Sequence, residues 1–174
     1  TYPGSRWLEY TYNAAGQRTQ NKFADGSHWD YGYDSLGQVT NAVRTWATGA
    51  TVAGQQFGYV FDNIGNRNQE MRNGSDIRKA VYTANLLNQY TQRTVPGFLD
   101  ILGTASVNAT VTVSNQPVTR QGAYFYKALA VDNTNAAVWA SVPVLGVLNT
   151  GTTSNDADIV SSSTGHLFLA KTAE

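Results

Sequence analysis

In the first half of the chain, large apolar residues alternate with polar ones at a period of two. The three clearest rows are Leu8, Tyr10 and Tyr12; Trp29, Tyr31 and Tyr33; and Phe57, Tyr59 and Phe61. Side chains at i, i+2 and i+4 of a strand lie on one face of a sheet, so each row predicts a strand with an aromatic face. With no helical periodicity in this half, we expect about eight strands over residues 7–95, paired antiparallel in sequence order.

Each row runs into the same turn sequence, in which Asp or Asn is followed three residues later by Gly or Asn. The four pairs are Asn13 and Gly16, Asp34 and Gly37, Asp62 and Gly65, and Asn85 and Asn88. The Asx side chain can accept backbone N–H groups, and the fourth position needs a left-handed backbone, which suits Gly. This chemistry predicts hairpins closed by a type I turn with a bulge. Asp25-Gly26 and Asn73-Gly74 predict further hairpin turns, and Ala47–Gln55 a longer loop.

The turns belong to a ten-residue block that occurs four times, beginning at Tyr10, Tyr31, Tyr59 and Tyr82. The shared pattern is Y-x-[YFA]-[DN]-x-[AIL]-[GN]-[QN]-x-[TN]. Such spacing is typical of stacked repeat proteins. The blocks resemble the YD repeats of the RHS family, whose core is a Tyr-Asp pair before a Gly turn; Tyr33-Asp34 with Gly37 matches it outright, whereas Ala84-Asn85 departs most. The resemblance implies that residues 1–95 form a hairpin strip of the kind that builds the hollow β-shell of large bacterial secreted or surface proteins, often around a toxin.

The second half has a different strand pattern. The stretches that alternate or are rich in β-branched residues are Ala109–Val113, Val118–Arg120, Ala123–Asp132, Val138–Val147 and His166–Ala170. Pro143 predicts an interruption, at an edge or a bulge, and residues 149–165 a long polar loop. A turn is expected at Asn115–Pro117. The stretch from Ala109 is similar to bacterial immunoglobulin-like repeats, which implies a small β-sandwich over residues 96–174. The expected fold is therefore all-β, an antiparallel hairpin strip plus a sandwich.

Composition and charge narrow the function. Lys plus Arg and Asp plus Glu are both 12, so the formal net charge is zero and the basic face typical of nucleic-acid binding is not expected. There is no cysteine, and no apolar run approaches the length that spans a bilayer. We expect no cofactor and no membrane span. The resemblance to the RHS family implies an extracellular location, with neighbouring repeats of the parent chain as partners.

Trp7, Trp46 and Trp139 lie outside the shared blocks and are candidate rings for stacking on a carbohydrate. The aromatic rows themselves are better explained by packing between strands. Asp34 and Asp62 are accounted for by turn capping, and no pair of carboxylates indicates acid–base catalysis. The run Asn155–Asp158 lacks the spacing of a calcium loop. We therefore expect no metal site and no catalytic residue: the leading hypothesis is a structural shell segment, and the alternative is a carbohydrate-binding β module.

Overall fold

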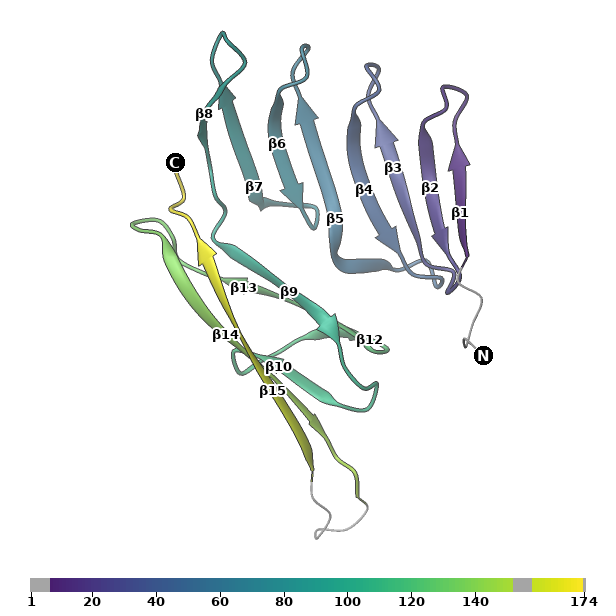
Figure 1. The fold of residues 1–174 in the computed structure, drawn as a ribbon, viewed down its shortest axis with the longest axis vertical. Helices are drawn as coiled ribbons and strands as arrows, with labels where there is room; N and C mark the ends of the chain where they lie inside the picture. Colours follow the sequence, from purple (N-terminus) through teal and green to yellow (C-terminus); the bar gives the residue numbers. More distant parts are fainter. Residues whose placement is uncertain (1–6, 152–157, 174) are drawn as a thin grey trace. The chain divides into compact units, whose positions relative to one another are not determined.

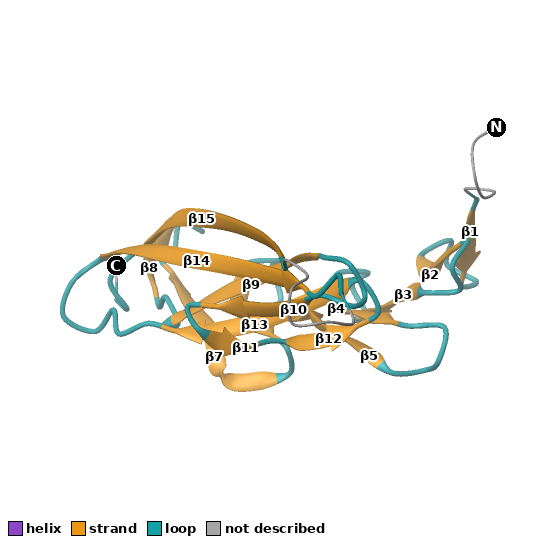
Figure 2. Ribbon diagram, turned by 90° about the horizontal axis from the view of Figure 1, so that it is seen from below, coloured by secondary structure: helices purple, strands orange, loops and turns teal. Residues whose placement is uncertain are grey.

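The structure, a computed structural model, describes residues 7–151 and 158–173, apart from the side chains of residues 75–77 (Figure 1). In these residues the chain is all-β, with strands, turns and loops and no helix (Figure 2). It divides into two compact units, Thr1–Thr94 and Val95–Glu174. The division falls one residue before the expected boundary. Val95 belongs with the second unit, where its N–H donates to the Thr172 carbonyl at 2.8 Å.

The first unit is one antiparallel sheet in which every strand pairs with its neighbours in sequence (Figure 1). Its eight strands are β1 (Leu8–Tyr12), β2 (Arg18–Phe23), β3 (His28–Tyr33), β4 (Val39–Thr45), β5 (Thr51–Phe61), β6 (Arg67–Arg72), β7 (Ser75–Ala84) and β8 (Tyr90–Arg93). Most side chains of β2 to β6 are only half-buried. That level of burial is what a single-layer sheet produces, because each ring is covered by its neighbours on the same face rather than by a second layer.

A one-residue register shift follows each of the four repeated turns. In the β1–β2 hairpin Tyr12 is opposite Arg18, but Thr11 is opposite Gln20, so Thr19 is the extra residue of a β-bulge. The same shift occurs in the β3–β4, β5–β6 and β7–β8 hairpins. The Thr19 hydroxyl donates to the Thr11 carbonyl at 3.3 Å, and this hydrogen bond ties the bulged residue to the opposite strand.

The expected loop over Ala47–Gln55 is wrong for residues 51–55, which begin β5. The turn itself is short: the Trp46 N–H donates to the Ala50 carbonyl at 2.8 Å. Val43 is opposite Gln56 and Thr45 is opposite Thr51, so the first part of β5 contains several extra residues. Gly54, at φ +82°, supplies the left-handed backbone for this bend, and Val52 is fully buried in it. Figure 1 shows the resulting bend in β5.

The second unit consists of two sheets that share one hydrophobic core. The four-stranded sheet has the order β11-β10-β14-β15, and the three-stranded sheet the order β12-β13-β9. The strands are β9 (Phe98–Thr104), β10 (Thr110–Val113), β11 (Gln116–Pro117), β12 (Thr119–Gln121), β13 (Tyr124–Ala130), β14 (Val138–Leu148) and β15 (Ile159–Leu169). The core takes residues from both sheets, namely Leu99, Val111, Val113, Phe125, Val142 and Leu169. These strands therefore form a small sandwich.

Four features of this unit differ from the sequence-based expectation. β9 was not expected, and it pairs with β13 along its whole length. The expected turn at Asn115–Pro117 lies one residue earlier, because Ser114 and Asn115 both have positive φ and Val113 pairs with Gln116.

β14 continues through Pro143, and β15 begins at Ile159 inside the expected 149–165 loop. Pro143 is tolerated because its carbonyl faces the β10 side of the strand, where it accepts the Ser114 N–H at 2.8 Å. Its missing N–H therefore removes no bond to β15. The Ser- and Thr-rich part of β15 is a strand because it pairs with β14, although its side chains are exposed on both faces.

Candidate functional site

The four turns of the first unit are closed by the predicted Asx residues. In the first, the Asn13 carboxamide oxygen accepts the backbone N–H groups of Ala15 and Gln17, both at 3.0 Å. The side-chain oxygens of Asp34, Asp62 and Asn85 make the same two bonds at 2.8–3.0 Å. The fourth position is left-handed each time: Gly16, Gly37, Gly65 and Asn88 have φ between +59° and +94°. A short-range pattern thus sets each hairpin.

Successive turns also contact one another, which the sequence analysis missed. A Cβ built on Gly37 would lie 3.1 Å from the Gln17 amide nitrogen, and one on Gly65 would lie 3.8 Å from the Gln38 side-chain oxygen. In the third such contact Asn66 donates to the Asn88 side chain at 3.2 Å. The Gln or Asn that ends one turn therefore lies against the left-handed residue of the next turn.

Tyrosine hydroxyls make a second link between repeats. The Tyr33 hydroxyl donates to the Arg18 carbonyl at 2.7 Å, and the Arg67 N–H donates to the Tyr90 hydroxyl at 2.8 Å. Arg18 and Arg67 hold equivalent positions, five residues after the Asx. In the fourth block Ala84 replaces the aromatic residue that precedes the Asx, and Tyr90 makes the link instead from the strand after the turn.

The aromatic face of the sheet is interleaved with arginines. Arg18 lies over the Tyr10 ring at 4.2 Å, and Arg67 lies between the Tyr59 and Tyr82 rings at 5.6 and 5.3 Å. Trp29 stacks on Phe57 from a different hairpin at 6.0 Å. These distances suit cation–π and stacked-ring contacts. The rings thus contact one another and the arginines. Arg18 and Arg67 recur at the same position of the ten-residue block, so the sequence contained a signal for these contacts.

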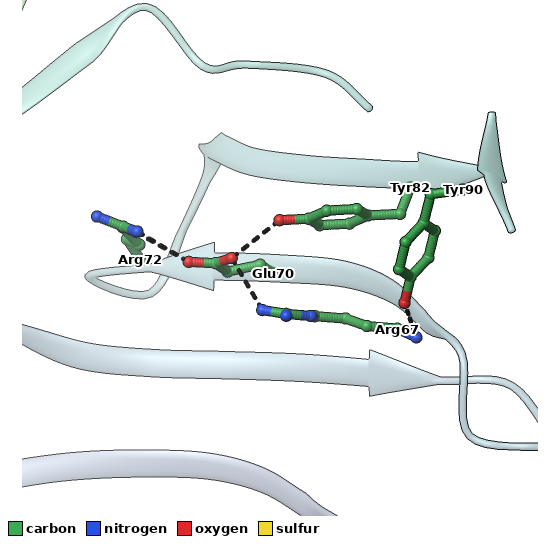
Figure 3. Close-up of polar contacts among 5 residues, drawn as sticks. All are labelled: Arg67, Glu70, Arg72, Tyr82 and Tyr90. Atoms are coloured by element: carbon green, nitrogen blue, oxygen red, sulfur yellow. Dashed lines mark hydrogen bonds and ion pairs between the residues drawn. The ribbon is translucent and has the colours of Figure 1, made fainter. Parts of the chain in front are cut away.

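Glu70 is the one carboxylate that β6 places among these rings and arginines (Figure 3). It accepts hydrogen bonds from Arg67 at 3.2 Å, from Arg72 at 3.1 Å and from the Tyr82 hydroxyl at 3.1 Å. Burial of the Tyr82 ring, together with the Glu70 charge, raises the pKa of the Tyr82 hydroxyl above its ordinary value. Tyr82 therefore stays protonated as a donor at neutral pH, and the cluster ties β6 to β7.

The three candidate tryptophans are divided between the two units: Trp7 and Trp46 lie in the first and Trp139 in the second. Trp7 is 43% exposed and lines a recess of about 430 Å³ with Leu8, Phe23, Ala24 and Asp25. Trp46 is half-buried. Arg44 lies over both its ring and that of Phe23, at 5.8 and 5.0 Å. Phe23 is therefore common to the surroundings of Trp7 and Trp46.

A polar chain lies beside this recess. The Ser27 hydroxyl is fully buried and donates to the Asp25 carboxylate at 2.6 Å, while Arg44 donates to Ser27 at 3.2 Å and to Gln55 at 3.1 Å. The Ser27 hydrogen bond lowers the pKa of the Asp25 carboxyl below its ordinary value. Asp25 is thus an anion at the rim of an aromatic recess, and its carboxylate can accept hydrogen bonds from the hydroxyl groups of a ligand.

Trp139 makes a separate surface on the second unit. Its ring is 76% exposed and lies 5.0 Å from the ring of Phe168, its partner across the β14–β15 pair, which is 52% exposed. The described residues contain no group of three His, Cys, Asp or Glu side chains that would hold a metal ion. Of the run Asn155–Asp158, only Asp158 lies within the described residues. No helix in the described part of the chain is long and apolar enough to cross a membrane.

Comparison with known proteins finds no matching family and no matching curated protein. Among solved structures the chain is similar to a crystal structure of TcdB2-TccC3-Cdc42, with 13% identity, a TM-score of 0.44 and coverage of 88% of this chain and 8% of that one. It is similar at 13% identity to a Photorhabdus luminescens Tc holotoxin pore and to TcdB2-TccC3-TEV, each with a TM-score of 0.43 and coverage of 92% and 7%. The chain spans less than a tenth of those proteins, and the TM-scores are too low to define its fold.

Proposed function

We propose that the chain is a structural segment of a larger bacterial secreted or surface polypeptide of the RHS/YD-repeat kind. In that role hairpin repeats continue one β-strip, which forms part of a shell that encloses a toxin or mediates contact between cells. The observation that carries the proposal is the contact between successive turns. The side chain that follows one turn lies on the left-handed residue of the next, from Gln17 to Gly37, from Gln38 to Gly65 and from Asn66 to Asn88.

Such a contact suits a repeat array, because each hairpin turn packs against the turn before it and presents an equivalent surface to the turn after it. The polar and aromatic groups of this unit are also largely engaged internally. Asp34 and Asp62 cap turns, and Glu70 is bound by two arginines and a tyrosine. The proposal therefore gives the chain no catalytic role.

Inserting one further repeat tests this function. A second copy of residues 31–58, placed between Gly58 and Tyr59, would add one hairpin in the register of the strip. In a repeat array the added neighbour contacts raise the midpoint of urea unfolding and the m-value, because more surface is buried. A 28-residue Gly/Ser insertion of the same length at the same place is the control. Destabilisation by the repeat equal to that by the control would refute the proposal.

A second candidate function is carbohydrate binding at the Trp7 recess. The observation that favours it is an exposed indole beside Phe23, with the Asp25 carboxylate at the same recess. Sugar rings stack on aromatic faces, while a carboxylate accepts hydrogen bonds from their hydroxyl groups.

A glycan array, followed by titration of any hit by tryptophan fluorescence, tests this candidate. Trp7→Ala is expected to abolish a hit at the recess. Trp139→Ala removes an exposed indole from the other unit and serves as the matched control. A blank array from the folded chain, or a hit lost only with Trp139→Ala, would refute binding at the recess and would leave the structural role unaffected.

A further inference from the structure

The outer edge of β15 differs from the other sheet edges of the described chain. Edge strands normally carry a charge or a proline that blocks pairing with another molecule. The other five edge strands each contain one, namely Glu9 in β1, Arg93 in β8, Asp100 in β9, Pro117 in β11 and Arg120 in β12. β15 is eleven residues long and has neither, with the sequence IVSSSTGHLFL. Among the described edges it is the one without protection.

The hydrogen-bonding groups on that edge follow from the position of Pro143. The Pro143 carbonyl faces β10, so those of its neighbours Val142 and Val144 face β15, where they pair with Gly165 and Ser163. Because backbone direction alternates along a strand, the odd-numbered residues of β15 bond to β14. The even-numbered residues point their N–H and C=O groups away from the sheet; they are Val160, Ser162, Thr164, His166 and Phe168. No strand of the described chain pairs with them.

The sequence of β15 is complementary to itself when read in the opposite direction. With Thr164 opposite its own copy in an antiparallel pair, Val160 meets Phe168 and Ile159 meets Leu169 of the other molecule. The polar middle of the strand, residues 162–166, lies opposite the same residues of the second molecule. Asp158, just before the strand, comes beside the second molecule's Lys171, just after it, so the flanking charges are opposite.

We propose that β15 pairs antiparallel with β15 of a second copy of this chain, about a two-fold axis at Thr164. The two four-stranded sheets then become one continuous sheet, and the five outward-facing residues of each copy exchange their backbone hydrogen bonds. Val160 and Phe168, now 60% and 52% exposed, cover each other across the axis beside Trp139. A second copy is the occupant that fits, because an isologous contact needs a self-complementary surface.

Sedimentation equilibrium of the whole chain across the micromolar range measures the association. The wild type is expected to be in monomer–dimer equilibrium. Thr164→Lys places two like charges opposite each other and is expected to weaken the dimer by at least about tenfold. Thr110→Lys adds the same charge to the outer face of β10, two strands from the edge, and is expected to leave the dimer unchanged. An equimolar mixture of the Thr164→Lys and Thr164→Glu variants is expected to restore dimerisation as a heterodimer.

Hydrogen exchange of the wild type gives a readout that does not depend on the folding of any variant. The amides of the five outward-facing residues are expected to become protected as concentration rises, whereas the odd-numbered amides are protected throughout. A monomer at all concentrations, with those five amides unprotected, would overturn the proposal. So would a dimer that Thr164→Lys leaves intact, or open-ended aggregation in place of a dimer.

Discussion

Gly37 allows the turn geometry to be tested in isolation from the rest of the sheet. Its φ is +82°, a backbone conformation that residues with a side chain rarely adopt, and an added Cβ would also lie 3.1 Å from the Gln17 amide. Gly16 holds the equivalent position at φ +76°, with no atom within 4 Å of its built Cβ. The two glycines therefore separate the backbone cost of a side chain from the cost of displacing the neighbouring turn.

The structure supports a graded series of free-energy losses. A non-glycine residue with left-handed backbone costs roughly 1–2 kcal/mol, which is the loss expected for Gly16→Ala. Gly37→Ala adds the displacement of Gln17, and the β-branched side chain of Gly37→Val brings the loss to about 3 kcal/mol. Gly37→Asn is expected to cost less than Gly37→Ala, because Asn88 adopts φ +59° at the same position. Ser35→Ala, in the same turn, is expected to stay within about 0.5 kcal/mol.

Urea unfolding of the whole chain, followed by tryptophan fluorescence, measures these losses. In thermal unfolding each kcal/mol corresponds to a shift of about 4–8 °C for a unit of this size. Equal losses for Gly37→Val and Ser35→Ala would refute the reasoning, because the left-handed position would then carry no cost. Equal losses for Gly37→Ala and Gly37→Asn would contradict the assignment of Asn88 as its equivalent.

Three further perturbations test the capping, the charged cluster and the second unit. The hydrogen bond from Asn66 lowers the pKa of the Asp62 carboxyl, so ionised Asp62 stabilises the fold above its unfolded pKa of about 3.9, and this stabilisation is lost as pH falls through the folded pKa. In urea unfolding at a series of pH values, Asp62→Asn is expected to reduce the loss of stability at acid pH. An unchanged loss at acid pH would exclude Asp62 as a contributor. Glu70→Gln is expected to lower the free energy of unfolding by about 1–3 kcal/mol, because the side chain is only 14% exposed and loses its ion pairs with two arginines. It is also expected to reduce the salt dependence of unfolding. No change in either quantity would show that the cluster does not stabilise the fold. Asn133→Ala, at a site 2% exposed, removes a donor from the Ala170 and Val95 carbonyls, of which the Val95 carbonyl still accepts the Thr172 hydroxyl at 3.0 Å. We expect the unfolding midpoint of the second unit to fall by the equivalent of about 1–3 kcal/mol, without a change in that of the first.

The local chemistry of the first unit could be read from the sequence. Each Asx side chain bonds to residues two and four positions away, and the left-handed Gly or Asn lies between them, so the information is contained in ten residues. Tight turns also force consecutive strands to pair, and the order of the sheet follows. The start of β5 was missed because Gly54 allows a bend within a strand. Glycine is equally typical of loops, so its presence did not distinguish a bent strand from a loop.

The candidate sites depended on contacts between residues far apart in sequence. The Trp7 recess includes Phe23 and Asp25 because β1 and β2 pair, whereas Trp139 lies in the other unit and pairs with Phe168. Sequence reasoning selected the tryptophans because they lie outside the blocks. It had no means to find the Arg44 and Ser27 chain, since 17 residues separate the two side chains.

By itself, the sequence determined that the chain is all-β and where the repeated hairpins turn, because backbone sterics and side-chain caps act within a few residues. Only the tertiary structure decided that β9 pairs with β13, that β14 continues through Pro143 and that the Ser-rich residues after Ile159 form a strand. A strand with two exposed faces carries no hydrophobic alternation. Its existence depends on the hydrogen bonds of a partner strand, and those bonds exist only once the sheet has formed.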